Sequence, residues 1–368
     1  MRNSRRTGKD LFVTERRIKM ILEETLKKIK EPSAGAMEAC RRHWDGIAKP
    51  LHSLGKMEDY LVKIAGMTGS SHINLEKKAL VIMCADNGVV EEGVTQSGQE
   101  VTATVSENFL TGKATSSIMC RVAKTDMFPI DIGIARDTML RNEKVAYGTR
   151  NMTKGPAMTR AEAVQAIETG IRIVRELKEA GYRIIATGEM GIGNTTTSSA
   201  LAAVFLDIPV EMVTGRGAGL STAGLTRKIS AIHRAIEVNK PDPRDGIDVL
   251  AKVGGFDLAG MAGLFLGGAA EGIPVVIDGI ISCAAAMAAY IICPGCVDYM
   301  LASHLSKEPA TRMLLSRMGL EAALDCDMRL GEGTGAVTLF PVLDLACAVY
   351  NSMSTFEEAS IEQYQPLS

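Results

Sequence analysis

Short, continuous apolar runs alternate with longer stretches along most of the chain. The first run, residues 79–85, reads Ala-Leu-Val-Ile-Met-Cys-Ala, which is typical of a parallel strand buried on both faces. Similar runs follow at 128–134, 183–186, 210–213, 274–277 and 299–302. The stretches between and after them predict helices at 161–180, 225–238, 258–267, 280–292, 310–320 and 334–353. This alternation predicts an α/β fold with a doubly wound, mostly parallel, Rossmann-like sheet.

The chain before the first strand has a different pattern. Residues 15–70 are amphipathic and helical in spacing, and an acidic, polar tail follows the last predicted helix. We therefore expect two units. A small helical subdomain would combine residues 1–75 with the tail 352–368, and a large α/β domain would occupy residues 76–351. The full length of 368 residues leaves ample material for the core of the large domain.

The stretch 186–198, Ala-Thr-Gly-Glu-Met-Gly-Ile-Gly-Asn-Thr-Thr-Thr-Ser, joins a predicted strand to a helix of small residues. Gly191 and Gly193 allow the backbone to approach an anion closely. The helix start at Asn194 and Thr195 offers unpaired N–H groups and the positive end of a dipole. Glu189 would stand at the carboxyl end of the strand, where α/β enzymes keep their chemistry. The alternative is a capped turn without a ligand, because the spacing matches neither a P-loop nor GxGxxG.

Other polar and glycine-rich turns follow the remaining predicted strands. A right-handed crossover brings all these turns to one edge of the sheet. Each turn alone is most often only a turn, but their coincidence predicts a site that wraps backbone around a phosphorylated ligand. The segments are Asp86-Asn87-Gly88 with the loop through Gln99, Gly215-Arg216-Gly217 leading to Lys228, Asp278-Gly279, Ser303-His304 with Ser306, and Gly331-Glu332-Gly333-Thr334-Gly335.

Composition and charge argue against several classes of function. Lys and Arg number 41 against 43 Asp and Glu, and aromatic residues make up 4%, so nothing favours a nucleic-acid partner. The uncharged run 279–297 is rich in Ala and broken by Cys-Pro-Gly-Cys. We therefore read it as a buried strand–helix unit and not as a membrane span. With no secretory signal evident, we expect a cytoplasmic protein.

The residues that could hold a metal are scattered. The five histidines show no HxxxH or HExxH spacing, so we expect no metal site. The eight cysteines lie mostly inside apolar runs and read as small core residues of a reducing compartment. Cys293-x-x-Cys296 could be redox-active or half of a zinc site, but no second pair completes it.

Taken in order, these motifs resemble one family. The chain is similar to nicotinate-nucleotide:dimethylbenzimidazole phosphoribosyltransferases, which make the lower-ligand nucleotide of cobalamin. The resemblance extends from about residue 15 to 353. The residues that carry it are Lys49-Pro50, Ser53-Leu54-Gly55, Asp86-x-Gly88-Val89, Gln99-Glu100-Val101-Thr102, Asp131-x-Gly133, Gly188-Glu189-Met190-Gly191-Ile192-Gly193-Asn194-Thr195-Thr196, Gly215-Arg216-Gly217, Arg227-Lys228, Asp278-Gly279, Ser303-His304 and Gly331-Glu332-Gly333-Thr334-Gly335.

The resemblance implies transfer of 5-phosphoribosyl from nicotinate mononucleotide to a benzimidazole nitrogen, with inversion to the α anomer and without metal or cofactor. Glu332 would be the general base, Glu189 a second carboxylate, and Asp86, Asn87 and Gln99 would border the base pocket. The resemblance also implies a homodimer in which the N-terminal helical part reaches the partner's site. The residues expected to hold the phosphoribosyl group are Gly191, Gly193, Asn194, Thr195, Gly215, Arg216, Gly217, Lys228, Ser306 and Gly333.

Simple chemistry agrees with this interpretation. Nicotinate leaves its nucleotide as a neutral heterocycle, so the site must supply a base, a phosphate anchor and negative charge near the sugar. Asn87 stands where the family usually has His, and residues 95–98 lack the family's aromatic–proline pair, so the accepting base stays open. Two alternatives also stay open. One is a phosphoribosyltransferase with a pyrophosphate donor and Mg²⁺, which the lone Asp278 disfavours, and the other is a non-catalytic nucleotide-binding protein.

Overall fold

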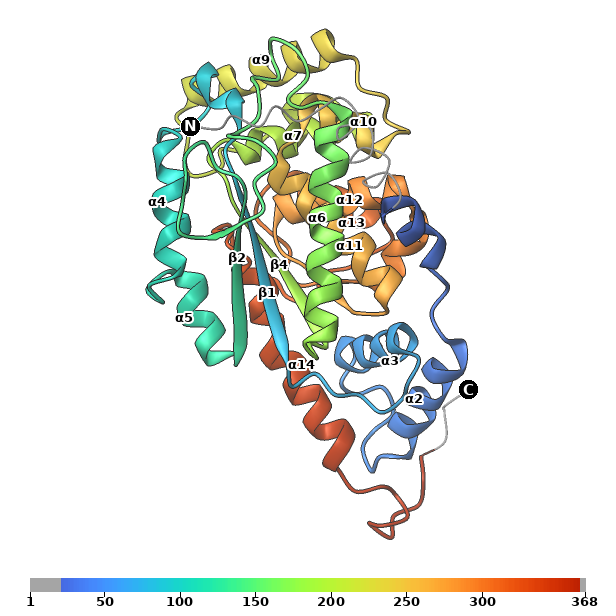
Figure 1. Cartoon of the computed structure of the whole chain (residues 1–368). Helices are drawn as coiled ribbons and strands as arrows, with labels where there is room; N and C mark the ends of the chain where they lie inside the picture. Colours follow the sequence, from blue (N-terminus) through green and yellow to red (C-terminus); the bar gives the residue numbers. More distant parts are fainter. Residues whose placement is uncertain (1–20, 365–368) are drawn as a thin grey trace.

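The computed structural model describes residues 21–364, which form a six-stranded parallel sheet with helices on both faces (Figure 1). The strand order is β3-β2-β1-β4-β5-β6. This order reverses direction between β1 and β4, a point at which open α/β sheets form a ligand crevice. The strands are β1 (Lys78–Ala85), β2 (Thr125–Gly133), β3 (Arg141–Asn142), β4 (Ile184–Met190), β5 (Val275–Ile277) and β6 (Met300–Ala302).

The sheet confirms the predicted α/β class and most of the predicted strands. All eight residues of β1 are buried, as its unbroken apolar run requires. The prediction for 210–213 is wrong, because Val210–Val213 forms the one-turn helix α8. Pro209 precedes it, and the hydroxyl of Thr214 donates to Val210 O at 2.6 Å. An apolar run of four residues does not distinguish a strand from a buried helical turn.

Two layers of helices enclose the sheet. In the view of Figure 1, α6 passes in front of the strands and α14 behind them. The alternation of side chains along β1 explains this division, since Met83 faces Gly260 of α11 and Leu80 faces Gly333 at the start of α14. The helices are α2 (Ala34–Gly46), α3 (Lys56–Thr68), η1 (Gly88–Glu92), α4 (Glu100–Phe109), α5 (Thr115–Val122), α6 (Arg160–Glu179), α7 (Asn194–Leu206), α9 (Thr222–Asn239), α10 (Gly246–Val253), α11 (Phe256–Glu271), α12 (Ile280–Ile292), η2 (Pro294–Tyr299), α13 (Ala310–Arg317) and α14 (Thr334–Ser352).

The N-terminal helices and the chain after α14 lie together. Ile47 pairs with Thr355 in an antiparallel bridge, and Phe356 N donates to Gly46 O at 3.0 Å. Helix α3 is joined to the end of the sheet, because the Tyr60 hydroxyl donates to Ala302 O at 2.6 Å. The division into a small and a large unit stays a prediction, and residues 1–20 and 365–368 lie outside the described residues.

Helix α14 is long and apolar enough to cross a membrane by length and composition alone. Half of its most apolar window is buried inside the protein, and the helix packs on α5 and β4. A core helix passes the same test, so α14 is weak evidence for a membrane span. Helix α12, from the uncharged run 279–297, is shorter and is buried from Ile280 to Ala289.

Helices α6 and α11 approach each other so closely that only glycine fits between them. A methyl group at Gly263 would overlap Ile167 O, and one at Gly170 would overlap Gly260 O. We expect Gly263→Ala to destabilise the protein by about 1–3 kcal/mol, the usual cost of overpacking a core. Urea unfolding measures this cost. Gly35→Ala in α2 is the control, because nothing lies within 4 Å of the added methyl group.

The control should leave stability unchanged or raise it by up to about 1 kcal/mol, because alanine is the better helix former. Equal unfolding free energies for the two variants would contradict the close approach of α6 and α11.

Candidate active site

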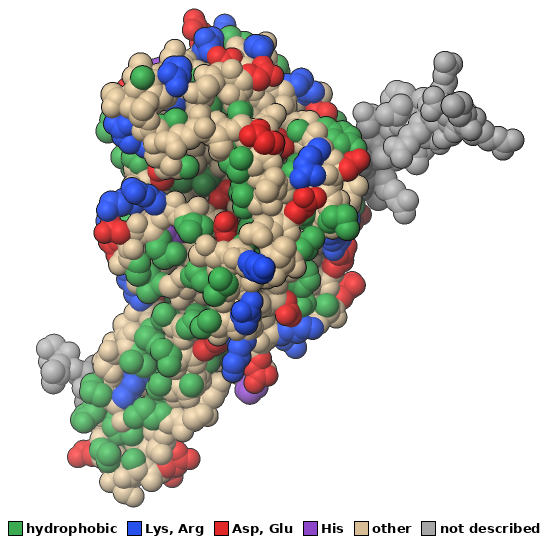
Figure 2. Space-filling model, turned by 90° about the vertical axis from the view of Figure 1, so that its left-hand side faces the viewer, with side chains coloured by type: hydrophobic (Ala, Val, Ile, Leu, Met, Phe, Trp, Pro, Cys, Tyr) green, Lys and Arg blue, Asp and Glu red, His purple; other side chains and the backbone are tan. Residues whose placement is uncertain are grey.

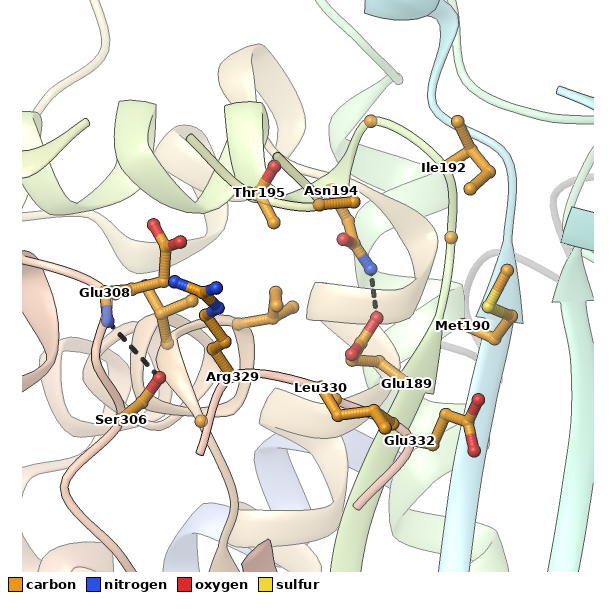
Figure 3. Close-up of a pocket in the computed structure, with 18 of the residues that line it drawn as sticks. Glu189, Met190, Ile192, Asn194, Thr195, Ser306, Glu308, Arg329, Leu330 and Glu332 are labelled. Carbon is orange, nitrogen blue, oxygen red and sulfur yellow. Dashed lines mark hydrogen bonds between the residues drawn. The ribbon is translucent and has the colours of Figure 1, made fainter. Parts of the chain in front are cut away.

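A cavity of about 190 Å³ opens at the carboxyl ends of β4, β5 and β6 (Figure 3). Its walls come from the turn after β4, the loops after β5 and β6, and the segment before α14. Residues 94–97 and the segment 216–220 complete the lining. The sequence-predicted residues that line it are Glu189, Gly191, Gly193, Asn194, Thr195, Arg216, Gly217, Ser306 and Glu332. Gly215, Lys228 and Gly333 lie one layer behind this wall, whereas Asp86, Asn87 and Gln99 do not line the cavity.

The turn after β4 presents the start of α7 to the cavity. Gly193 has a φ of 97° and no side chain caps the helix. Asn194 N donates to Gly191 O at 3.1 Å and Thr196 N to Gly193 O at 2.9 Å, so among the described residues the Thr195 N–H is the first-turn donor left to bind an anion. Asn194 and Thr195 form this first turn, and both line the cavity. A residue with a β-carbon would be strained at Gly193 and would also press against Val90.

Lys228 of α9 is fully buried behind the same turn. Its ammonium donates to Thr195 Oγ1 at 2.9 Å and to Gly215 O at 3.2 Å, and among residues 21–364 it forms no ion pair with a carboxylate. Burial lowers its pKa to about 8, although the charge of Glu308 opposes this shift. A buried cation held by neutral oxygens is poorly compensated. A phosphate in the cavity would supply the missing negative charge.

Two arginines bring further positive charge to this side of the cavity. Arg216 and Arg329 both line it, and Arg329 extends beside Ser306 and Glu308 in Figure 3. Sequence reasoning missed Arg329, which stands outside every glycine motif although it shortly precedes one. Ser306 is buried, and Glu308 N donates to its hydroxyl at 3.5 Å.

Glu189 lies near the end of β4 inside the protein and belongs to a buried acidic cluster. The amide of Asn194 donates to Glu189 Oε2 and, at 3.0 Å, to Asp257 Oδ2. Burial is the largest cause that raises the pKa of Glu189 to about 8 and that of Asp257 to about 6. No local pattern in the sequence marks Asp257, since an acid in the first turn of a helix is common for reasons of dipole alone.

Glu332 lies on the segment that leads into α14. Its φ is 59°, between Gly331 at 93° and Gly333 at 78°, so three successive residues have left-handed backbone. Its carboxylate accepts hydrogen bonds from Ser116 Oγ at 3.0 Å and Ser116 N at 3.3 Å. In Figure 3 it extends past Met190, whereas the Glu189 carboxylate points toward Asn194. The two carboxylates therefore point to different parts of the site.

The three residues expected at the base pocket lie at the turn after β1. Asp86 Oδ2 accepts from Ala135 N at 2.8 Å, and the buried Asn87 amide lies beside the Asp257 carboxylate. Gln99 donates to Asn87 O at 3.5 Å. The start of α11 packs against these strand ends, since Phe256 lies against Gly133 and the Asp257 carboxylate lies near Gly191. The open cavity lies at the carboxyl ends of β4, β5 and β6. Nonpolar cavity walls come instead from side chains such as Met190 and Leu330.

A family model described as phosphoribosyltransferase matches residues 29–361. A relative from Ruminiclostridium cellulolyticum, named nicotinate-nucleotide–dimethylbenzimidazole phosphoribosyltransferase, is 48% identical over 95% of this chain and 100% of its own. A relative of the same name from Acetivibrio thermocellus is 48% identical over 94% of this chain and 99% of its own. The chain belongs to this phosphoribosyltransferase family.

Solved structures of the family share the fold. The crystal structure of CobT from Thermus thermophilus superimposes with a TM-score of 0.84 and 37% identity, covering 90% of this chain and 100% of that one. A second structure from the same organism, titled with the full enzyme name, gives the same values. The fold of this chain is therefore that of the solved family members, and its cavity lies at the carboxyl ends of the parallel strands.

The buried acids make stability depend on pH. The pKa of Glu189 rises from 4.5 to about 8 on folding, so the folded protein binds more protons than the unfolded chain within that window, and the unfolding free energy falls as pH rises through it. Glu189→Gln removes this loss. We expect the Tm of the variant minus that of the parent protein to increase steadily from about pH 5 to about pH 8.

Thermal unfolding of ligand-free protein measures this gain. Glu237→Gln, an exposed position on α9, is the control, and its Tm should follow that of the parent protein at every pH. If the difference between Glu189→Gln and the parent protein is the same at all pH values, Glu189 does not change its protonation on folding.

Proposed function

We propose that this protein transfers the 5-phosphoribosyl group of nicotinate mononucleotide to a benzimidazole-type base, giving the α-ribotide and nicotinate for cobalamin biosynthesis. The observation that carries the proposal is the division of the cavity. One side holds the open start of α7 and the uncompensated Lys228, which suit a phosphate. The other side holds the Glu332 carboxylate beyond Met190 and Leu330. The names of the relatives supply the donor and the acceptor.

The reaction places one requirement on each side. The acceptor nitrogen forms a bond to the anomeric carbon while the bond from that carbon to the nicotinate nitrogen breaks. The electron pair of the broken bond goes to the nicotinate nitrogen, so nicotinate leaves with a neutral pyridine ring. The proton of the acceptor N–H passes to the Glu332 carboxylate as general base. Glu189, near the developing positive charge of the sugar, favours that charge when ionised. The cationic donor in turn favours the ionised form of Glu189 and opposes the effect of burial on its pKa.

The rival with a pyrophosphate donor receives less support. That chemistry relies on paired acids that hold Mg²⁺, whereas the Asp278 carboxylate accepts from Ala336 N at 3.0 Å and caps α14. Residues 21–364 contain no group of three or more His, Cys, Asp or Glu side chains placed to hold a metal ion.

The direct test supplies nicotinate mononucleotide and 5,6-dimethylbenzimidazole and measures released nicotinate and the α-ribotide. Glu332→Gln keeps the size of the side chain but cannot accept the proton. We expect kcat to fall by about 10²–10⁴ with nucleotide affinity nearly unchanged. No nicotinate release by the parent protein with any of a panel of benzimidazoles, purines and phenols would refute the proposed reaction. Normal kcat in Glu332→Gln would refute only the base.

Lys228→Met tests the phosphate side with little change in volume. Loss of a hydrogen bond from a charged donor should weaken binding of nicotinate mononucleotide by about 1.5–3 kcal/mol, while the affinity for the free base stays the same. Isothermal titration measures both affinities. Arg227→Met is the control, because this exposed neighbour donates to Gly93 O and does not line the cavity. Equal nucleotide affinity in the two variants would return Lys228 to a purely structural role.

We also propose that the protein is a homodimer in the cytoplasm. Apolar side chains of Ile118 and Val122 on α5 and Leu345 on α14 are 49%, 78% and 63% exposed. Apolar groups gather over the lower part of the face in Figure 2, and a patch of this kind commonly meets a partner. A mass near the 39.3 kDa of one chain in light scattering would contradict the dimer.

The cysteines support the cytoplasmic location. All eight are free, which suits a reducing compartment.

A further inference from the structure

The carboxylate of Glu332 is held by a residue that is 216 positions away in the sequence. Ser116 donates to Glu332 Oε2 through both its hydroxyl and its backbone N–H, at 3.0 Å and 3.3 Å. Ser116 is fully buried in the first turn of α5. Helix α5 begins after Ala114, which has no side chain able to cap it. The Glu332 carboxylate therefore takes the place of the missing cap.

We propose that Ser116 is a positioning residue that holds the Glu332 carboxylate aimed at the acceptor. The inference rests on the proposed function of Glu332 as general base. A hydroxyl donor, a backbone donor and the positive end of α5 all favour the negative charge on Oε2. Glu332 Oε1 has no hydrogen-bond donor among the described residues, so it is the oxygen left to receive the acceptor proton.

The backbone of Glu332 makes this support necessary. A non-glycine residue with a φ of 59° bears the strain of left-handed backbone, and a glutamate side chain has several rotamers to choose from. Two hydrogen bonds to one oxygen fix the orientation of the carboxylate. Without the Ser116 hydroxyl, the backbone N–H alone would remain, at the longer of the two distances.

Other ionisable groups near Glu332 come from several elements. Besides Glu332, those that line the cavity are Glu189 on β4, Asp278 after β5, His304 and Glu308 after β6, and Arg216 and Arg329. Helix α5 adds one charged side chain, Arg121, which donates to Gly112 O at 3.0 Å. None of these groups is altered by a change at Ser116, so a shift on Ser116→Ala reports the loss of its hydroxyl.

The experiment compares Ser116→Ala with Ser117→Ala. Ser117 is the next residue of α5, is also buried, and donates to Phe109 O at 3.3 Å. Among the described residues it forms no hydrogen bond with Glu332. We measure kcat/KM for dimethylbenzimidazole against pH, because this ratio reports the ionisation of the free enzyme. Removing a hydrogen-bond donor to the carboxylate destabilises the anion. The acid limb of Ser116→Ala should therefore move up by about one pH unit.

Three comparisons decide the outcome. The acid limb of Ser117→Ala should match that of the parent protein. The acceptor itself also titrates, but it does so equally in every profile and cannot cause a difference between variants. Ser116→Thr keeps a hydroxyl and should restore the limb. In a Glu332→Gln background, Ser116→Ala should change the residual rate less than about twofold, since the carboxylate it serves is gone.

An unmoved acid limb in a folded Ser116→Ala protein, with Glu332→Gln still inactive, would overturn the role of Ser116 and leave the proposed function standing. Full activity in Glu332→Gln would overturn the base and the role of Ser116 together. Equal shifts in Ser116→Ala and Ser117→Ala would show a general disturbance of α5 and would also count against the inference.

Discussion

Two neighbouring residues in the first turn of α7 hold a buried carboxyl group and a buried amino group. Asn194 donates to the Glu189 carboxylate, and Thr195 accepts from the Lys228 ammonium at 2.9 Å. Both groups are withdrawn from water, so the charged form of either is costly unless something compensates it. The position of α7 is thereby coupled to the end of β4 and to α9. The walls of the cavity depend on this arrangement, because the turn between Glu189 and Asn194 lines it.

Much of the fold could be predicted from the spacing of apolar residues. The buried run at 79–85 and the glycine turn after β4 are strong local signals, and the structure confirms the parallel sheet that they predict. The run 210–213 failed because four residues carry too little periodicity, and a preceding proline favoured a helical turn. The strand order and the α6–α11 contact needed the structure, since glycines such as Gly263 are explained only by the neighbouring helix.

The candidate site was less accessible to sequence reasoning. Residues within glycine turns, such as Asn194 and Glu332, were found because the turns mark sheet edges. Asp257 and Ser116 begin helices and have no unusual local pattern, so their roles follow only from what they contact. The family resemblance implies that Asn87 borders the base pocket, and that role stays a prediction. The structure places Asn87 beside the start of α11, a long-range contact that its own segment does not encode.

The burial of Lys228 has a thermodynamic consequence. With its pKa lowered to about 8, the empty site is partly deprotonated in mildly alkaline solution, whereas an anion beside it favours the charged form. In the proposed phosphate site, proton and phosphate would therefore be heterotropic ligands, and each would raise the affinity for the other by an equal factor. Nucleotide binding there, near the pKa of this ammonium, would take up protons from the buffer. Part of the heat of binding then belongs to the buffer's own ionisation.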